Sequence, residues 1–402
     1  MPSVPTREPV DGALQSGSRS AELGSDALKY LAGGDSRTGL WQAPWPLYVE
    51  RAAGNRIWDV DGQSRLDMNP NNTSHIHGHV HPDISQALAT QIMKGTSYNL
   101  LTEQEVRLAR HIVGRIDSVD RVRFTNSGTE AIMNAIRAAW AHTGRSKVAK
   151  FEGPYHGSFP AVDISLEPQD EEGGPDDQPA SVAASPGTPA AMVENTIVLP
   201  FNRPDQVEAI IRRHAADLAA VIVEPVPSNL SWIQPRPGFL ERLRELTRSL
   251  GILLVFDEIV DFRLAHGGVQ SLHGIDPDLT TLGKFAGGGL PFGVLGGRLE
   301  VMEAFDHTRG GPHIQHSGSF NGNPMSTTAG LVTLELLTPS EIQRINDLGD
   351  WLRNELLDRI EVGRFNATVT GYGSLLCFFP TKRSPGCVAP CSSRASRTAP
   401  AR

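Results

Sequence analysis

From residue 122 onward, short apolar segments alternate with segments of helical periodicity, and this alternation restricts the possible folds more than any other feature. The run Ile252–Phe256 is apolar throughout, which is typical of a strand buried on both faces of a parallel sheet. Further strands are expected at 122–125, 148–151, 197–199 and 219–223. The sequence therefore predicts an α/β fold with a mostly parallel sheet flanked by helices.

The length and composition fit a large globular protein and argue against several classes of partner. A chain of 402 residues can form two or more domains, or one large α/β unit with an appendage. Its net charge of −8 argues against nucleic acids and anionic membranes as partners. The 3 cysteines, the lack of an apolar leader and the lack of a membrane-length apolar run predict a cytoplasmic protein.

Histidines alternate with other residues at His75, His77, His79 and His81. Such a cluster can bind a metal, but no cysteine or carboxylate arrangement supports a metal site here. Alternation of His with Gly also suits a loop over a polar cavity. We therefore expect no metal at these residues.

The segment Asn126–Glu130 joins an expected strand to an expected helix through a glycine-containing turn. Backbone N–H groups and the positive end of the helix dipole make such a turn a phosphate site. The hydroxyls of Ser127 and Thr129 could add donors to it. The alternative is an ordinary helix cap formed by one of these hydroxyls. From these residues alone both interpretations stay open.

Two further side chains follow expected strands. Tyr155 comes shortly after 148–151, where the carboxyl end of a strand faces the ligand crevice of such a sheet, and it could stack on a planar ring. Asp257 follows Ile252–Phe256 directly, and a carboxylate there is costly unless it is paired. Asp257 is therefore either a structural hydrogen-bonding residue or the partner of a buried cation.

Lys284 lies within the stretch Thr281–Gly289, among four glycines. Glycines allow a close approach to a flat ligand, and a lysine held away from water loses its proton more readily and becomes a nucleophile. The alternative is a glycine-rich turn with a surface lysine. Arg37, in a polar loop before Leu40–Trp45, could clamp a carboxylate, or it is a solvated loop arginine.

Taken in order, these features match the requirements of pyridoxal 5′-phosphate: a phosphate cradle, a stacking aromatic, a buried aspartate and a nucleophilic lysine. In this interpretation Asp257 pairs with the pyridinium nitrogen and Lys284 forms the aldimine and moves the α-proton. The order of the four features along the chain supports this cofactor more strongly than any single motif does.

These motifs resemble the class III, fold-type I pyridoxal-phosphate aminotransferases, near the glutamate-1-semialdehyde aminomutase branch. The matching stretches, which lie between about residues 30 and 380, include RFTNSGTEAIMNAIRAA, KFEGPYHG, VIVEPV, LLVFDEI, DLTTLGKFAGGGLPFGVLGGR and HSGSFNGNP. The resemblance implies a large domain with a seven-stranded sheet and a small α+β domain built from both chain ends.

The resemblance also implies roles for individual residues. Lys284 is the aldimine lysine and Asp257 the partner of the pyridine nitrogen, with His156 and Glu224 as further cofactor and substrate contacts. Ser127, Gly128 and Thr129 bind the phosphate, and Tyr155 and Ile259 face the two sides of the ring. Ser319, where the family usually has threonine, donates to the phosphate of the neighbouring subunit, which implies a homodimer.

Three functions remain open at this stage. The stretch GGDSRTGLWQAPWPLYVERAAG and the stretch DEIVDFRLAHGGVQ resemble β-amino-acid aminotransferases, in which the arginine matching Arg37 holds the substrate carboxylate. We therefore expect an aminotransferase that moves an amino group from an amino acid, with β-amino acids among the candidates, to a 2-oxo acid. The alternatives are glutamate-1-semialdehyde 2,1-aminomutase and a protein that binds the cofactor without turnover.

The third alternative comes from the C-terminal residues, which are rich in Ser, Pro, Ala and Arg and differ from the family pattern. The expected organisation is a flexible arm (1–20), an N-terminal part of the small domain (21–70), a large cofactor domain (71–325), a linking helix with a partial, truncated C-terminal small domain (326–380), and a disordered tail (381–402). We also expect exposed apolar surface on Phe378, Phe379 and a helix at 348–360, and a long flexible loop at 166–193.

Overall fold

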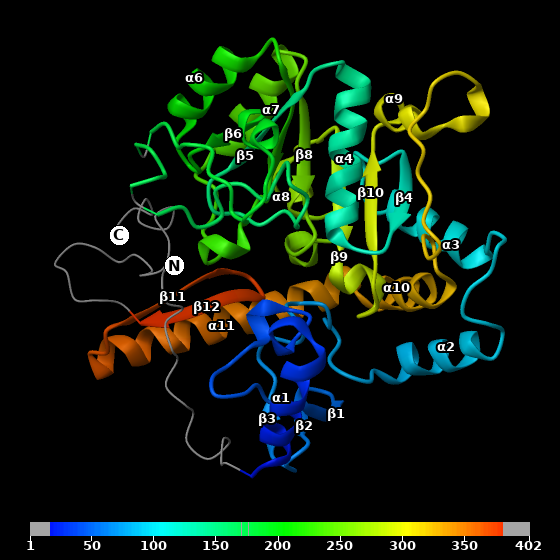
Figure 1. Ribbon diagram of the computed structural model, residues 1–402, viewed down its shortest axis with the longest axis vertical. Coiled ribbons are helices and arrows are strands. Elements are labelled where there is room, and N and C mark those ends of the chain that lie inside the picture. Colours follow the sequence, from blue (N-terminus) through cyan, green and yellow to red (C-terminus); the bar gives the residue numbers. More distant parts are fainter. Residues whose placement is uncertain (1–16, 170, 176, 381–402) are drawn as a thin grey trace. The chain divides into compact units, whose positions relative to one another are not determined.

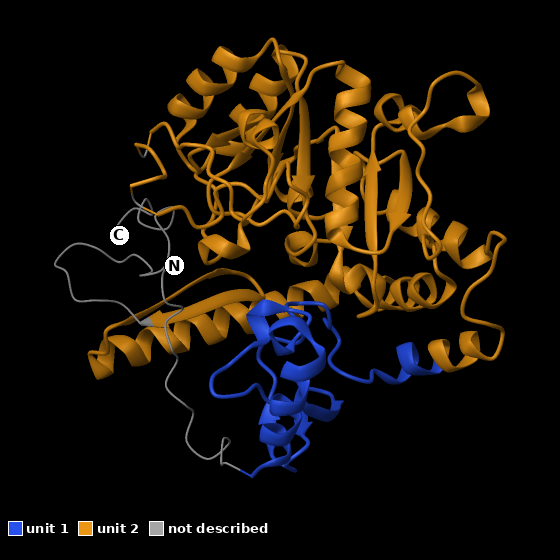
Figure 2. Ribbon diagram, in the orientation of Figure 1, with its two compact units in different colours: residues 1–86 blue, residues 87–402 orange. Residues whose placement is uncertain are grey.

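The computed structural model describes residues 17–169, 171–175 and 177–380 and contains two compact units (Figures 1 and 2). Unit 1 extends to Gln86, and unit 2 begins at Ala87. The predicted tail at 381–402 and residues 1–16 of the predicted arm lie outside the described residues. The domain boundaries expected from the sequence stay predictions.

Unit 1 combines a helix with a small antiparallel sheet, α1 (Arg19–Tyr30), β1 (Val49–Ala53), β2 (Arg56–Asp59) and β3 (Ser64–Leu66). Ser18 caps α1 by accepting a hydrogen bond from Ala21 N at 3.1 Å, so the helix overlaps the last two residues of the predicted arm. Strands β2 and β3 form a hairpin whose turn contains Asp61. Asp61 accepts from Arg19 N at 2.6 Å, which fixes the hairpin turn to the start of α1.

The four alternating histidines, His75, His77, His79 and His81, lie in this unit. Within the described residues they are not part of any group of three or more side chains that could hold a metal ion. His79 Nε2 is 2.7 Å from Asp67 Oδ2, and the backbone of His79 pairs with that of Gly54. The rings of His75 and His79 contact one another, as do those of His77 and His81.

Unit 2 is built on a seven-stranded sheet with the order β4-β10-β9-β8-β7-β5-β6. Its strands are β4 (Arg121–Thr125), β5 (Lys147–Phe151), β6 (Thr196–Leu199), β7 (Leu218–Val223), β8 (Leu253–Asp257), β9 (Leu279–Gly283) and β10 (Gly293–Gly297). Neighbouring strands from β9 to β6 pair in parallel, whereas β10 is antiparallel to both β9 and β4. The predicted α/β class and mostly parallel sheet are confirmed.

Helices cover both faces of this sheet because successive side chains of a strand point to opposite faces (Figure 1). One core contains Val221 and Val223 of β7 together with residues of α6 (Pro204–His214) and α7 (Phe239–Ser249). The other contains Ala220 and Ile222 of β7 together with residues of α4 (Gly128–Thr143). The strands are therefore buried on both sides, as their continuous apolar character predicts.

The chain also forms further helices and a two-stranded sheet, β11-β12; of these elements α2 begins in unit 1 and ends in unit 2. They are α2 (Pro82–Ile92), α3 (Glu103–Val113), α5 (Ala190–Glu194), α8 (Val269–His273), α9 (Leu299–Met302), α10 (Pro324–Leu336), α11 (Pro339–Gly363), β11 (Ala367–Tyr372) and β12 (Leu375–Pro380). No helix in the described ranges is both long and apolar enough to cross a membrane.

Two C-terminal expectations change in detail. The helix expected at 348–360 begins at Pro339, because Thr338 caps it by accepting from Glu341 N at 3.2 Å. The end of the expected partial small domain is a hairpin, β11 and β12, which turns at Gly373 with φ +52°. Apolar side chains are exposed in this region, as expected, at Phe378, Leu348 and Trp351. Phe379 is half-buried instead.

The long segment 166–193, expected to be a flexible loop, is fixed at several points. Ser165 N donates to Val182 O at 2.7 Å, and Ser181 Oγ donates to Thr196 O at 2.5 Å. Its last residues form the first part of α5. The described part of this segment is therefore attached to the sheet beside β6, because its hydroxyls satisfy backbone groups there.

Candidate active site

Four side chains converge because parallel strands present their carboxyl ends on the same side of a sheet. Strands β5, β7, β8 and β9 are consecutive neighbours in the order β9-β8-β7-β5. His156 follows β5, Glu224 follows β7, Asp257 ends β8 and Lys284 follows β9. The structure therefore brings together residues that are up to 128 positions apart (284 − 156) in the chain.

Asp257 is held by hydrogen bonds from three directions. His156 Nδ1 is 2.7 Å from Oδ2 of Asp257, while Oδ1 accepts from Ile259 N at 3.2 Å and from Thr281 Oγ1 at 3.3 Å. Asp257 is 4% exposed, and within the described residues His156 is its only partner at ion-pair distance. The structure thus leaves Asp257 as a fixed acceptor whose remaining lone pairs can take a ligand N–H.

His156 is the neutral partner in this contact. Burial lowers the pKa of its imidazole, although its hydrogen bond to Asp257 and the charge of Asp257 oppose that shift. Nδ1–H therefore donates to Asp257, and Nε2 is an unprotonated acceptor. Nε2 is buried and makes no hydrogen bond within the described residues. The sequence had placed His156 among the cofactor contacts without indicating its bond to Asp257.

Lys284 begins the short helical turn Lys284–Gly287 after β9 and has φ 50°, in the left-handed region that non-glycine residues rarely occupy. Burial lowers the pKa of its amine, and the carboxyl groups of Glu224, Asp257 and Asp261 oppose that shift. No hydrogen bond or ion pair of this amine is formed within the described ranges. An amine in this condition loses its proton readily and becomes a nucleophile.

Glu224 lies at the end of β7 and is 3% exposed. Burial raises the pKa of its carboxyl to about 8, and the nearby charge of Asp257 adds to that shift. Lys284 and hydrogen bonds from Ser228 act in the opposite direction. At neutral pH the carboxyl is therefore mostly protonated. Its Oε2 is buried without a hydrogen-bond partner in the described structure.

The turn between β4 and α4 contains the helix cap that the sequence allowed, while phosphate binding at this turn stays a prediction. Ser127 caps α4 by accepting from Glu130 N at 3.2 Å, and Glu130 accepts from Asn126 N at 2.9 Å. The backbone N–H groups at the start of α4 have no intrahelical partner. Ser127 is therefore a helix cap at a helix N-terminus that can still bind an anion.

Glycines bring this turn close to its neighbours. A Cβ on Gly128 would lie 2.6 Å from Ile259 Cδ1, and one on Gly157, with φ +90°, would lie 2.5 Å from Thr129 Oγ1. The side chain of Ile259 also lies next to Gly283, directly before Lys284. Ile259 therefore packs between the start of α4 and the lysine turn, which is a position suited to one face of a ring.

Ser319 and Tyr155 are more exposed than the other candidates. Ser319 lies on an exposed loop next to Asn321, and Asn321 Oδ1 accepts from Asn126 Nδ2 at 2.8 Å. This bond attaches the loop to the turn before α4. Tyr155, which follows β5, is 46% exposed. Asn126 and Asn321, which bind one another, and Thr281, which binds Asp257, were not predicted from the sequence. Single amides and hydroxyls of this kind form no distinctive sequence pattern.

Arg37 belongs to unit 1, whereas the strand-end residues belong to unit 2. Its guanidinium is exposed, and Nη1 donates to Asn71 Oδ1 at 2.6 Å. The backbone N–H of Arg37 donates to Asp35 Oδ1 at 2.9 Å, which shapes the loop that carries it. The exposed guanidinium retains further N–H donors.

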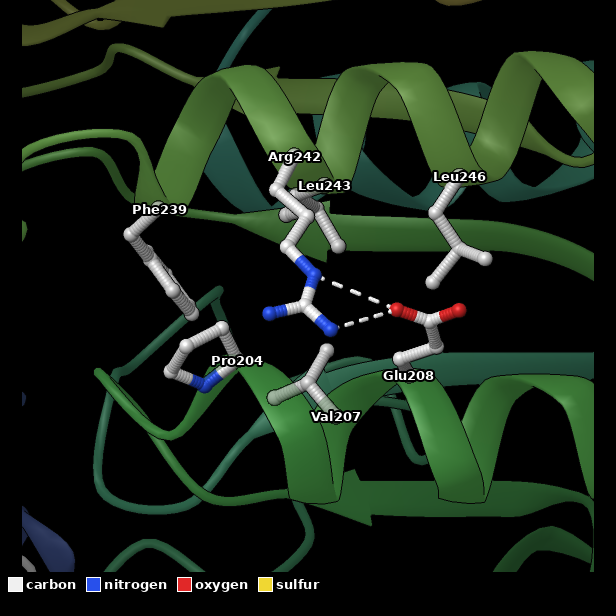
Figure 3. Close-up of a pocket in the computed structure, with 7 residues that line it drawn as sticks. All are labelled: Pro204, Val207, Glu208, Phe239, Arg242, Leu243 and Leu246. Carbon is white, nitrogen blue, oxygen red and sulfur yellow. Dashed lines mark hydrogen bonds and ion pairs between the residues drawn. The ribbon is translucent and has the colours of Figure 1, made fainter.

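A small pocket between α6 and α7 is separate from these groups (Figure 3). Arg242 spans it and binds Glu208 at 2.7 Å. Its lining contains none of the strand-end residues, and it consists of Pro204, Val207, Glu208, Phe239, Arg242, Leu243 and Leu246. The ion pair is exposed to solvent, so it adds little stability.

Comparison with known protein families gives one match over most of the chain. The family described as aminotransferase class-III matches residues 39–386. Among curated proteins, a glutamate-1-semialdehyde 2,1-aminomutase from Heliobacterium modesticaldum is 41% identical over 340 residues, covering 84% of this chain and 76% of the relative.

Solved structures resemble the fold closely. An omega-transaminase from Sphaerobacter thermophilus is 44% identical, with a TM-score of 0.88 over 92% of this chain and 84% of that one. A transaminase with PLP bound is 38% identical, with a TM-score of 0.86 over 91% and 85%. A β-phenylalanine aminotransferase from Variovorax paradoxus is 35% identical, with a TM-score of 0.82 over 94% and 82%.

The raised pKa of Glu224 makes stability depend on pH in a predictable direction. The folded pKa of about 8 lies above the ordinary value of 4.5, so the contribution of this group to the free energy of unfolding falls as pH rises between these values. Glu224→Gln stays neutral and should lack this decline. Relative to wild type, the variant should gain on the order of a few kcal/mol between pH 5 and pH 8.

Urea unfolding of both proteins at pH 5 and pH 8 measures this difference. Glu361→Gln, at an exposed position on α11, serves as the control and should follow the wild-type pH dependence. Equal pH dependence for wild type and Glu224→Gln would contradict the assignment of a buried, protonated carboxyl.

Proposed function

This chain belongs to the class-III aminotransferase family, and we propose that it transfers an amino group from an amino acid to a 2-oxo acid with pyridoxal 5′-phosphate as cofactor. One observation carries the proposal: the amine of Lys284, which has no hydrogen-bond partner in the described structure, and the hydrogen-bonded carboxylate of Asp257 lie at the ends of neighbouring strands. They come from adjacent parallel strands, β9 and β8. We infer β-amino acids as the donor class from the sequence around Arg37 and from the β-phenylalanine aminotransferase relative.

The residues present fit this cofactor. Buried atoms without partners in the described structure, His156 Nε2 and Glu224 Oε2, leave polar capacity beside Asp257 and Lys284. The absence of a Cβ at Gly128 and Gly157 allows the start of α4 to pack closely against Ile259 and the turn after β5. A helix N-terminus suits a phosphate, and a fixed carboxylate suits a protonated ring nitrogen.

In this proposal each residue has one task at the cofactor. Ser127, Gly128 and Thr129 bind the phosphate, while Tyr155 and Ile259 contact the two faces of the ring. Asp257 accepts the N–H of the ring nitrogen, and Lys284 holds the cofactor covalently. When bound, the cofactor would supply an electron sink for the negative charge that develops on the substrate carbon bearing the amino group.

Side chains of the protein would then move or hold the protons that the transfer requires. The amine of Lys284, with its pKa lowered by burial, would take the proton from the amine-bearing carbon of the donor and, in the second half of the transfer, deliver a proton to the carbon of the 2-oxo acid that receives the amino group. His156 holds Asp257 in one orientation by donating from Nδ1. Glu224, mostly protonated at neutral pH, presents a neutral carboxyl next to the amine and contacts the substrate without adding a second full negative charge.

Replacement of the lysine tests the proposal directly. Lys284→Ala should abolish covalent attachment of the cofactor and reduce turnover by at least about a thousandfold, because both the attachment and the proton transfer are lost. Borohydride reduction followed by peptide mass analysis should find the cofactor on the peptide with Lys284 in wild type only. Lys29→Ala, at an exposed lysine of α1, should behave as wild type. Retention of the cofactor on a different lysine would refute the assignment.

A second function, glutamate-1-semialdehyde 2,1-aminomutase, is supported by the curated relative from Heliobacterium modesticaldum. The two reactions differ in whether a second substrate is needed. We expect formation of glutamate from 2-oxoglutarate with a β-amino acid as donor. Conversion of glutamate-1-semialdehyde to 5-aminolevulinate without a second substrate would favour the aminomutase instead. Cofactor binding with neither reaction would identify a protein that binds without turnover.

Arg37 is proposed as the group that binds the donor carboxylate. Arg37→Ala should raise KM for β-amino acids by about tenfold to a hundredfold, in line with the loss of one charged hydrogen-bonded contact. It should leave turnover of a simple amine that lacks a carboxylate unchanged. Arg56→Ala, at another exposed arginine of unit 1, is the matched control. Equal losses for donors with and without a carboxylate would exclude this role.

We further propose a homodimer in which Ser319 reaches the phosphate of the neighbouring site. Exposed apolar side chains gather at Met93, Leu100 and Leu101, each more than 80% exposed. Their loop is attached to the loop of Ser319, because Asn323 Nδ2 donates to Thr96 O at 2.9 Å. An exposed apolar patch of this kind indicates a protein interface. We also propose that its substrates are a small-molecule amino acid and a 2-oxo acid, and that the protein is cytoplasmic.

Mixed dimers test whether the site is shared. Lys284→Ala and Ser319→Ala chains are each expected to lose activity alone. A mixture that exchanges subunits should recover activity, because one site then contains both Lys284 and Ser319. A monomeric protein by sedimentation, or no recovery in a verified mixed dimer, would rule out the shared site.

A further inference from the structure

Asp261 is a buried carboxyl that the proposed reaction does not use. It lies four residues after Asp257, in the short helical turn Asp261–Leu264, and is fully buried. Aspartates are rarely buried to this degree unless they are paired. Oδ2 accepts a hydrogen bond from Val226 N at 2.9 Å, and Oδ1 has no partner within the described residues.

The donor, Val226, is two residues after Glu224. Between them lies Pro225, which has no backbone N–H. The N–H of Val226 is therefore the first backbone donor after Glu224 by which this turn can be held. Val226 itself is packed with Val260, Leu264 and Val269 in an apolar cluster. Water cannot easily replace Asp261 there, so loss of the carboxyl would leave a buried N–H without a partner.

The charges around Asp261 favour its protonated form. Burial raises the pKa of its carboxyl well above the ordinary value, and the carboxyls of Glu258, Glu224 and Asp257 add to the shift. Lys284 is close enough to Glu224, Asp257 and Asp261 for their charges to act on its amine. As a neutral acid, Asp261 can accept from Val226 N through Oδ2 without adding a charge near Lys284.

We propose that Asp261 is a positioning residue whose Oδ2, without needing a negative charge, holds the turn Glu224–Val226 in place by accepting from Val226 N. The bond joins the segment after β7 to the segment after β8, so it fixes Glu224 relative to β8, the strand that pairs with β9 and therefore with the segment that carries Lys284. The inference rests on the proposed function only in taking Lys284 as the residue that carries the cofactor.

Two substitutions separate position from charge. Asp261→Asn keeps an oxygen that can accept from Val226 N and cannot ionise, whereas Asp261→Leu removes the acceptor. Val260→Ala, in the same apolar cluster, controls for lost packing. The measurement is a pH titration of the visible absorbance of the bound cofactor in purified full-length holoenzyme, together with amide hydrogen exchange of the peptide that contains Val226.

The pH at the midpoint of the absorbance titration should be the same in Asp261→Asn and in Val260→Ala as in wild type. In Asp261→Leu the turn opens to water, which favours the protonated nitrogen at Lys284, so the midpoint should rise by about one pH unit. Exchange of the peptide with Val226 should be faster by at least about tenfold in this variant and unchanged in Asp261→Asn.

Two results would overturn the proposal. A wild-type midpoint with unchanged exchange in Asp261→Leu would show that the carboxyl does not position the turn, and a shift of about one unit in Asp261→Asn would show that an ionised carboxylate is needed. If Asp261→Leu does not fold, Asp261→Ala, which also removes the acceptor, replaces it in both measurements. Absence of a lysine-bound cofactor in wild type would refute the proposed function separately.

Discussion

Parallel pairing of β8 with β9 is the constraint on which the candidate site depends. It places Asp257, the last residue of β8, beside Thr281 of β9, whose hydroxyl donates to it at 3.3 Å. Lys284 follows three residues later, just beyond the end of β9. A sheet with helices on both faces keeps these strand ends out of bulk water while leaving one side open to a ligand.

Burial of charged groups at these strand ends explains their chemistry. Removal from water disfavours the charged form of every group, so it raises the pKa of Glu224 and Asp261 and lowers that of Lys284 and His156. The opposite charges of the acids and the lysine limit these shifts. The result is a region in which protons can be exchanged near neutral pH, as proton transfer at a substrate carbon requires.

Much of the fold could be predicted from the sequence because its strands are apolar throughout and its helices are periodic. The expected strands at 148–151 and 252–256 lie within one residue of β5 and β8 at each end. The C-terminal hairpin was less predictable. A glycine turn at Gly373 divides one apolar segment into β11 and β12, and periodicity alone does not show where a strand reverses. The bond that attaches the loop at 166–193 to Thr196 was not predictable either, because it depends on one hydroxyl, that of Ser181, and a backbone group 15 residues away.

The sequence by itself determined the fold class, the order of the strands that carry Asp257 and Lys284, and the glycines that surround Lys284 and follow Ser127. These features are local, since they depend on apolar content, backbone freedom and chain order. Only the tertiary structure decided that His156 binds Asp257, that Ile259 packs between Gly128 and Gly283, and that Asp261 holds the turn at Val226. Each of these contacts joins segments far apart in the chain, and burial, which fixes their protonation, exists only once the sheet and its helices have packed.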